Sequence, residues 1–250
     1  MRQNTSEQNM LNGSEIWFGI EKNEGNIMDI KKEYERWLAN ATADADVAAE
    51  LKTLDDAKIE DAFYRDLAFG TGGLRGVIGA GTNRMNIYTV AKASQGLADY
   101  LKKNYAEPSV AIGYDSRIKS DVFAKVAAGV FAANGVKVNI WPVLMPVPTV
   151  SFATRYLHTS AGVMVTASHN PSKYNGYKVY GVDGCQIPRL QQRFLPRSRS
   201  WISLQTSRPA ILKQVWKTAV SSTSRTRSTP LSWSRSRASL FCSAKKSIRM

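Results

Sequence analysis

Residues 161–181, AGVMVTASHNPSKYNGYKVYG, constrain the fold and the function of this chain more than any other stretch. The apolar run at 162–165 is short and rich in β-branched residues, so it predicts a buried strand. A loop of small, polar and turn-forming residues follows at 166–171. Residues 177–180 predict a returning strand that carries Lys178 back toward this loop. A hydroxyl, an imidazole and an amide therefore meet just past the carboxyl end of a strand, where open α/β sheets place ligand sites.

The simpler interpretation of this loop is a turn, rich in Ser and Asn, that joins two strands. For the letters SHNP alone that interpretation would be preferred. A single short motif misleads more easily than a long constellation, however, and here the whole run has to be explained. We therefore expect functional side chains at Ser168, His169, Asn170 and Lys178.

Strands and helices alternate before this loop. The pattern predicts a helix from about 88 to 103, a strand at 110–112, a helix with Ser120 as N-cap and Gly135 as its stop, a strand at 138–141 and a short helix at 149–156. Such alternation favours an α/β layered domain with crossover connections.

Between residues 29 and 67, apolar residues recur at helical spacing and predict helices whose apolar stripes serve packing. The stripes comprise Ile30, Tyr34, Trp37, Leu38, Val47, Leu51, Leu54, Ile59, Phe63 and Leu67.

Two further motifs carry arginines. Residues 69–76, FGTGGLRG, hold four glycines that let the backbone approach a ligand, and Arg75 has the planar fork of donors that suits a phosphate. The segment is no Walker loop, because no Gly-Lys-Ser/Thr follows, and by itself it favours a turn with a solvated arginine. For Arg117, in GYDSR at 113–117, the residues alone leave open a ligand contact or a salt bridge within a loop.

Taken together, TASHNP, NGYKVYG and the following Asp183-Gly184 closely resemble the phosphoserine loop of the α-D-phosphohexomutases, the phosphoglucomutase/phosphomannomutase family. FGTGGLRG and GYDSR are similar to motifs of the same family. The resemblance implies a three-layer α/β/α first domain preceded by helices. It also implies an isomerase that interconverts hexose 1-phosphate and 6-phosphate, a sugar-phosphate substrate, and a hexose 1,6-bisphosphate as intermediate and activator.

The resemblance further implies a role for each matching residue. Ser168 would carry the exchanged phosphoryl group, with Mg²⁺ bound partly through that phosphate, and Lys178 would be the general acid/base. His169 and Asn170 would orient the phosphoserine or the attacking hydroxyl. Arg75 would lie near the phosphoserine, and Arg117 and Thr71 would bind the substrate or its phosphate.

Charge is distributed unevenly along the chain. Residues 188–250 contain 14 Lys and Arg and no Asp or Glu, which accounts for the whole net charge of +14. This leaves an alternative from another class, a nucleic-acid-binding protein with a basic Ser/Arg-rich arm. The boundary directly follows the family motif, so we expect instead that 188–250 is a frame-shifted translation of the same gene, disordered, and that nucleic acid is no partner. Read two bases later, one allowed spelling of 188–205 encodes an amphipathic helix.

The remaining expectations concern organisation and location. Cys185 and Cys242 form no disulfide framework, no apolar run reaches the length of a membrane span, and a cytoplasmic protein is expected. Residues 1–27 are expected to be a disordered leader upstream of a true start at Met28, followed by a helical extension at 28–68 and the α/β domain at 69–187. The family's further motifs do not follow, so we expect this truncated chain to be inactive.

Overall fold

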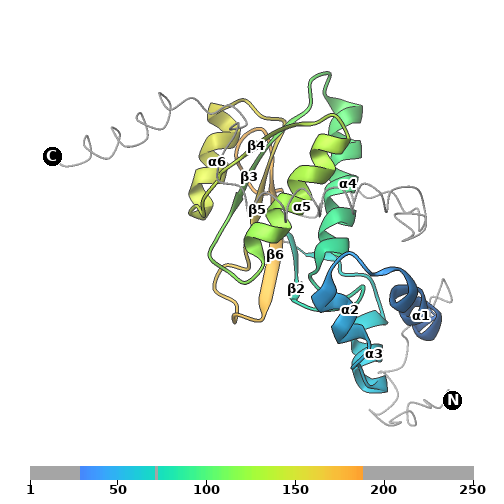
Figure 1. Ribbon diagram of the computed structural model, residues 1–250. Coiled ribbons are helices and arrows are strands. Elements are labelled where there is room, and N and C mark those ends of the chain that lie inside the picture. Colours follow the sequence, from blue (N-terminus) through green and yellow to red (C-terminus); the bar gives the residue numbers. More distant parts are fainter. Residues whose placement is uncertain (1–28, 71–72, 188–250) are drawn as a thin grey trace, which may run out of the picture.

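The computed structural model describes residues 29–70 and 73–187, and Figure 1 shows their arrangement. The expected leader, the tail and Thr71 therefore lie outside the described residues. Three short helices come first: α1 (Ile30–Asn40), α2 (Ala45–Leu51) and α3 (Asp56–Phe63). Before each, an aspartate carboxylate accepts hydrogen bonds from backbone N–H groups of the first turn, which fixes where the helix begins.

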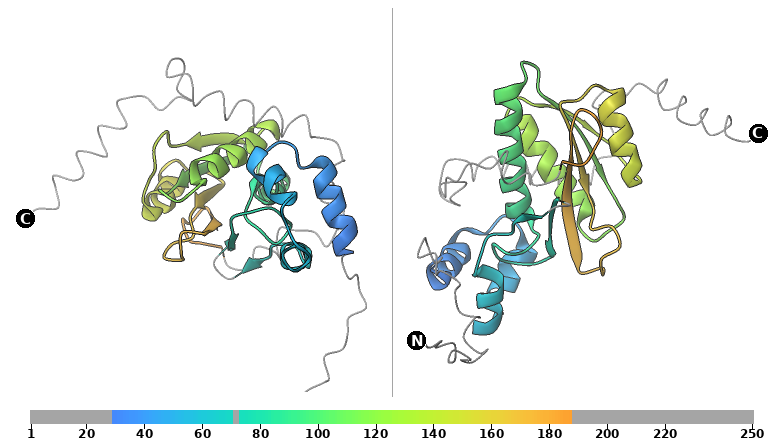
Figure 2. Two further views of the ribbon diagram at one scale, coloured as in Figure 1. Left: turned by 60° about the horizontal axis from the view of Figure 1, so that its bottom comes forward. Right: turned by 180° about the vertical axis from the view of Figure 1, so that it is seen from behind.

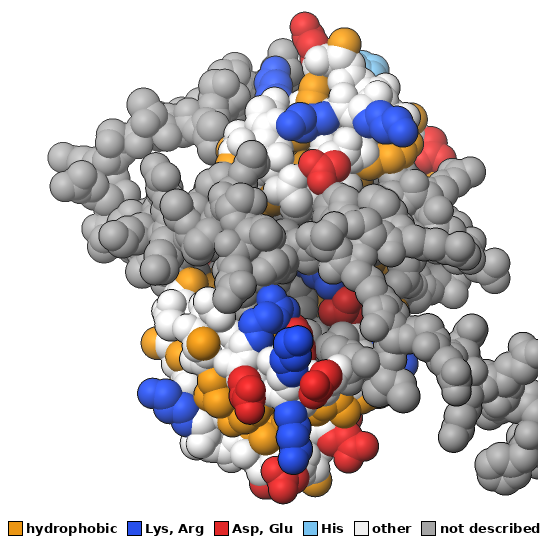
Figure 3. Space-filling view, turned by 90° about the vertical axis from the view of Figure 1, so that its right-hand side faces the viewer, with side chains coloured by type: hydrophobic (Ala, Val, Ile, Leu, Met, Phe, Trp, Pro, Cys, Tyr) orange, Lys and Arg blue, Asp and Glu red, His pale blue; other side chains and the backbone are white. Residues whose placement is uncertain are grey.

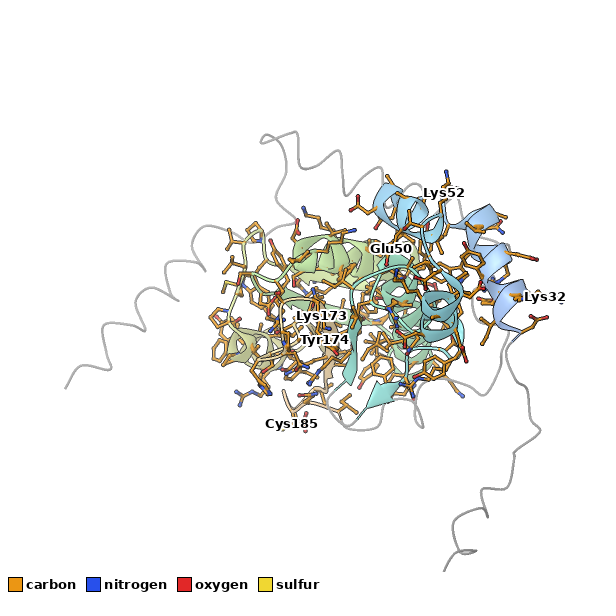
Figure 4. The ribbon with its side chains drawn as sticks, turned by 90° about the horizontal axis from the view of Figure 1, so that it is seen from below. Lys32, Glu50, Lys52, Lys173, Tyr174 and Cys185 are labelled. Carbon is orange, nitrogen blue, oxygen red and sulfur yellow. The ribbon has the colours of Figure 1, made fainter. Side chains whose placement is uncertain are left out.

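Aromatic packing joins these helices to the rest of the fold. The Trp37 ring lies edge-on to Phe63 and to Tyr88, with centroids 5.7 and 5.2 Å apart. The predicted stripe is therefore confirmed at Trp37 and Phe63, both buried, but it is wrong at Leu38, which is 40% exposed. Glu50 lies on the inner side of α2, where it accepts a hydrogen bond from the Ala80 amide, whereas Lys52 and Lys32 lie at the periphery (Figure 4).

The sheet has the order β1-β2-β6-β5-β3-β4. Its strands are β1 (Phe69–Gly70), β2 (Gly73–Val77), β3 (Ser109–Tyr114), β4 (Lys137–Ile140), β5 (Ala161–Val165) and β6 (Tyr174–Tyr180). β3 runs parallel to β4 and to β5, while β6 runs antiparallel to β5 and to β2. Because β4 lies on one side of β3 and β5 on the other, the chain reverses its winding at β3.

Helices cover both faces of the sheet, which confirms the expected α/β fold (Figures 1 and 2). α4 (Ile87–Asn104) and α5 (Ser120–Ala133) lie on one face, and α6 (Val147–Tyr156) lies on the other. Side chains alternate accordingly: Val163 and Val165 of β5 join the large core under α4 and α5, whereas Met164 joins a smaller core under α6. The same alternation in β6 directs Lys178 away from the α4–α5 face.

Two local predictions need correction. Ser120 is the first residue of α5 and not its N-cap; Lys119 occupies the cap position without a side-chain cap, because the Ser120 hydroxyl donates to Asp115 instead. In the glycine-rich segment, residues 69–70 form β1 and residues 73–76 belong to β2, because β1 pairs with β2 and β2 pairs with β6. The other elements lie within about three residues of their predicted bounds. None of the helices among the described residues is long and apolar enough to cross a membrane.

Candidate active site

The loop between β5 and β6 lies at the carboxyl end of β5, beside the carboxyl end of β3. This is the point at which the winding of the sheet reverses, where α/β folds open a crevice for ligands. Ser168 has a φ of 58°, so its backbone adopts the left-handed conformation that non-glycine residues rarely take. Such conformations cost about 1–3 kcal/mol and persist only where the surroundings impose them.

Arg117, from the loop after β3, binds the backbone of the loop between β5 and β6. Its Nη2 donates to the carbonyl oxygens of Ser168 and Asn170, both at 2.6 Å. Its Nη1 donates to the carbonyl oxygens of Pro171 and Tyr174, both at 3.1 Å. The Arg117 side chain is only 14% exposed and is also paired with Asp115, at 3.6 Å from Nε.

Asp115 connects the same two loops through hydroxyl groups. One carboxylate oxygen accepts from the Thr166 hydroxyl at 2.6 Å, and the other accepts from the Ser120 hydroxyl at 2.8 Å. Thr166 Oγ1 in turn accepts from the backbone N–H of Ser168 at 2.9 Å. Asn175 completes the network by donating to Ser120 Oγ at 3.0 Å. Ser120, Thr166 and Asn175 are buried, and the bonds of this network supply the partners that buried polar groups need.

Arg75 and Lys178 approach the loop from β2 and β6. Arg75 stands opposite Gly176 in the register of these strands, and its Nη1 donates to Asn170 Oδ1 at 2.9 Å. Burial lowers the pKa of Lys178, and repulsion from Arg75 lowers that pKa further, while attraction to Asp115 partly offsets both. The site therefore combines a cationic surface with a lysine that gives up its proton more easily than usual.

The Ser168 hydroxyl and His169 lie on the exposed side of the loop. Ser168 Oγ and His169 Nδ1 are 3.4 Å apart, a separation that places the two groups side by side. At the far end of the loop, where β6 begins, the Lys173 ammonium lies 5.8 Å from the centre of the Tyr174 ring (Figure 4).

Of the residues predicted from sequence, the structure brings Ser168, His169, Asn170, Arg75 and Arg117 together in hydrogen-bonded contact, and places Lys178 within electrostatic reach of Arg75. Sequence reasoning missed the four residues below the loop, namely Asp115, Ser120, Thr166 and Asn175. Asp115 and Thr166 could have been noticed, because each comes within three residues after a predicted strand and the carboxyl ends of neighbouring parallel strands meet at one edge. Nothing local indicated Ser120 or Asn175.

The donor set for a metal ion is small. Among residues 29–70 and 73–187, no three His, Cys, Asp or Glu side chains gather closely enough to hold a cation. Asp115, whose carboxylate bonds to Thr166 of the loop, is already engaged by Arg117 and two hydroxyls. The described side chains alone thus do not fit Mg²⁺; a phosphate on Ser168 would bring oxygen ligands that they lack.

The fold and the site together define an α/β domain with a cationic, serine-bearing loop at its switch point. The family described as phosphoglucomutase/phosphomannomutase, alpha/beta/alpha domain I, matches residues 66–195. The chain belongs to this family.

The chain is also similar to individual proteins. A phosphoglucomutase of Staphylococcus haemolyticus is 48% identical over 128 residues, which is 51% of this chain and 23% of the relative. A protein of Schizosaccharomyces pombe assigned as a phosphoribomutase is 43% identical over 164 residues, 64% of this chain and 28% of the relative. A crystal structure from Thermus thermophilus assigned as a phosphomannomutase aligns with a TM-score of 0.48 and 32% identity over 53% of this chain and 30% of that one. The chain thus spans about a quarter of the length of the curated relatives it matches.

Proposed function

We propose that this chain supplies the phosphoserine domain of a sugar-phosphate mutase, which interconverts the 1-phosphate and the 6-phosphate of a hexose. The observation that supports the proposal most is the Ser168 loop: a serine in an unusual backbone conformation, in a loop that Arg75 contacts at Asn170 and Arg117 contacts at Ser168. The names of relatives include a glucose and a ribose mutase, so a pentose phosphate is a second candidate substrate.

In the proposed reaction, phosphorylated Ser168 gives its phosphoryl group to the free hydroxyl of a sugar monophosphate. The P–O bond to Ser168 breaks, a P–O bond to the sugar forms, and the product is a sugar bisphosphate. The bisphosphate then returns its other phosphate to Ser168. Such chemistry depends mainly on positioning and on neutralising charge, and Arg75 would supply a cation for the phosphate.

Lys178 is proposed as the group that takes the proton of the attacking hydroxyl. A lysine can accept a proton near neutral pH only if its pKa is lowered, and burial together with Arg75 does lower the pKa of Lys178. Mg²⁺, which the family resemblance implies, would neutralise charge on the transferring phosphate. Because the described side chains do not form its site, we assign no step to it.

A grafted enzyme tests this function. Residues 66–187 would replace the matching segment of the Staphylococcus haemolyticus phosphoglucomutase, and turnover of glucose 1-phosphate would be measured in a coupled assay. We expect Ser168→Ala to abolish turnover, because it removes the covalent carrier. Lys178→Met should lower the rate about 10²–10⁴-fold while Ser168 stays phosphorylated, as intact mass would report.

Two results of the grafted-enzyme assay would contradict the proposal. Turnover that survives Ser168→Ala would refute Ser168 as the carrier, and an unchanged rate in Lys178→Met would leave Lys178 with no role in proton transfer. The 250-residue chain by itself serves as the negative control. We expect no turnover from it, because it spans only about a quarter of its relatives.

A basic nucleic-acid-binding arm at 188–250 is the second candidate function, supported by its 14 Lys and Arg. On the described surface, by contrast, acidic and basic side chains are interspersed on the face shown in Figure 3. Titration with a nucleic acid at rising salt, comparing the full chain with residues 1–187, separates the two candidates. Affinity that falls steeply with salt and disappears with the tail would favour the arm.

A further inference from the structure

The short segment after β3 holds Ser168 directly through its carbonyl oxygen and indirectly, by way of Thr166, through its N–H. The Ser168 carbonyl oxygen accepts from Arg117 Nη2, and the Ser168 N–H donates to Thr166 Oγ1, whose own hydroxyl proton goes to Asp115. Asp115 in turn accepts from the backbone N–H of Arg117 at 3.0 Å. Arg117 therefore fixes the carbonyl side of Ser168 directly, and Asp115 fixes its N–H side through Thr166.

The guanidinium of Arg117 has little capacity left for anything else. An arginine has five N–H donors. Four of these have carbonyl partners, at Ser168, Asn170, Pro171 and Tyr174, and Nε faces Asp115. With its side chain 14% exposed, Arg117 cannot also grip a phosphate without releasing the loop. Arg75 differs in that it is exposed and donates to the side chain of Asn170, so its guanidinium can still reach a ligand.

We infer that Arg117 is a positioning residue that sets the conformation of the loop at 168–174, and that it is not a ligand of the substrate. This rests on the proposed function only in calling the loop catalytic. The arginine spans the loop from its first residue to the start of β6, and its charge offsets the negative ends of four carbonyl dipoles. Without this positive charge, the carbonyl oxygens would repel a phosphoryl group on Ser168.

Amide hydrogen exchange in the full 250-residue chain tests the inference without any assay of turnover. The reporters are the N–H groups of Ser168, Asn170 and Tyr174, which bond within the loop or to Thr166. In Arg117→Ala we expect these amides to exchange at least tenfold faster, while amides of α4 and β3 keep their rates. About 50 mM guanidinium, against the same concentration of NaCl, should restore the protection by refilling the cavity.

Arg84→Ala is the matched control, because Arg84 also binds carbonyl oxygens and a carboxylate, but at Asp61 and Asn83. It should leave the loop amides unchanged. Equal exchange in Arg117→Ala and in the wild-type chain, or a rise spread evenly over α4, β3 and the loop, would overturn the inference.

Arg117→Lys covers the case in which the alanine variant does not fold. One ammonium is a compact point charge that cannot reach carbonyls at both ends of the loop, so it should leave the loop amides exposed to exchange while the sheet stays protected. Full protection in Arg117→Lys would also overturn the inference. A substrate-binding Arg117 predicts a different result: loop exchange unchanged in Arg117→Ala, with weaker binding of inorganic phosphate measured by NMR titration. The failure of the grafted enzyme would leave this test unaffected.

Discussion

Ser168 combines the proposed nucleophile with a strained backbone, and the two properties can be measured separately. Ser168→Ala and Ser168→Gly both remove the hydroxyl, but only glycine adopts a φ of 58° without a steric clash, because it has no Cβ. We therefore expect the free energy of unfolding of Ser168→Gly to exceed that of Ser168→Ala by about 1 kcal/mol. Urea denaturation of the two variants measures the difference.

Ser172, an exposed residue of the same loop outside the left-handed region, provides the control pair. There, Ser172→Gly should be less stable than Ser172→Ala, because glycine loses more conformational freedom on folding. If the Ala variant is more stable than the Gly variant at both positions, the left-handed conformation of Ser168 is not strained. Arg117 would then hold the loop without stabilising an unfavourable backbone conformation.

Lys178 makes a prediction about pH. Burial and Arg75 lower its pKa in the folded state, so between the folded and the ordinary lysine pKa the unfolded chain binds more protons. Stability must therefore rise with pH in that window. Lys178→Met should be more stable than the wild-type chain at pH 7, and this gain should vanish as the pH passes the ordinary lysine value of about 10.4.

NMR titration of the lysine side chains checks the cause. In Arg75→Met, the pKa of Lys178 should rise, because one repulsive charge is gone. Arg65→Met removes an arginine that contacts Tyr64 and Asn83 and not β6, so it should leave the pKa of Lys178 unchanged. A Lys178 pKa that is the same in all three chains would contradict the electrostatic account.

At the scale of the elements, Gly176 of β6 shows how closely the backbones of the sheet and of the site loop are packed. A Cβ on Gly176 would lie 2.6 Å from the Thr166 carbonyl oxygen and 2.9 Å from that of Leu74. Both are backbone atoms of neighbouring segments and cannot rotate away. We expect Gly176→Ala to lower the free energy of unfolding by about 3 kcal/mol. Gly70→Ala, whose Cβ would meet only the Gly73 carbonyl oxygen at 3.8 Å, should change it by less than about 0.5 kcal/mol. Similar losses in the two variants would contradict the packing described here.

Elements with a strong apolar period were predictable from sequence, and so was the loop that follows β5. β1 and β2 were not, because their glycines have low strand propensity and only the pairing of β1 with β2 and of β2 with β6 makes them extended. The role of Arg117 was also out of reach. Its partners lie 51 to 57 residues further along the chain, and no local pattern encodes such contacts. Ser120 illustrates the same limit, since a capping serine and a serine that binds Asp115 look alike in sequence.

For the whole molecule, the helical extension and the site loop form one connected unit. Lys119, two residues after Arg117, is paired with Asp46 at 2.8 Å and with Asp44, the residue that caps α2. Although burial opposes its charge, these two carboxylates raise the pKa of Lys119 above the ordinary value. The segment after β3, which holds Ser168 through Arg117, is thereby also attached to α2 through Lys119. A movement of the helical extension would therefore displace the Ser168 loop.

The tail at 188–250 leads to a prediction about the gene. If these residues are translated out of frame, the change in composition has a simple cause: Ser codons of the TCN type and Arg codons of the AGR type become apolar and charged codons when read two bases later. The family match extends to residue 195, so DNA sequencing should cover codons 185–250. We expect the offset frame to encode an amphipathic helix directly after residue 187 and to remain open. A stop within its first twenty codons, or no helical period, would contradict the frame shift, and the basic arm would then have to be explained as a functional segment.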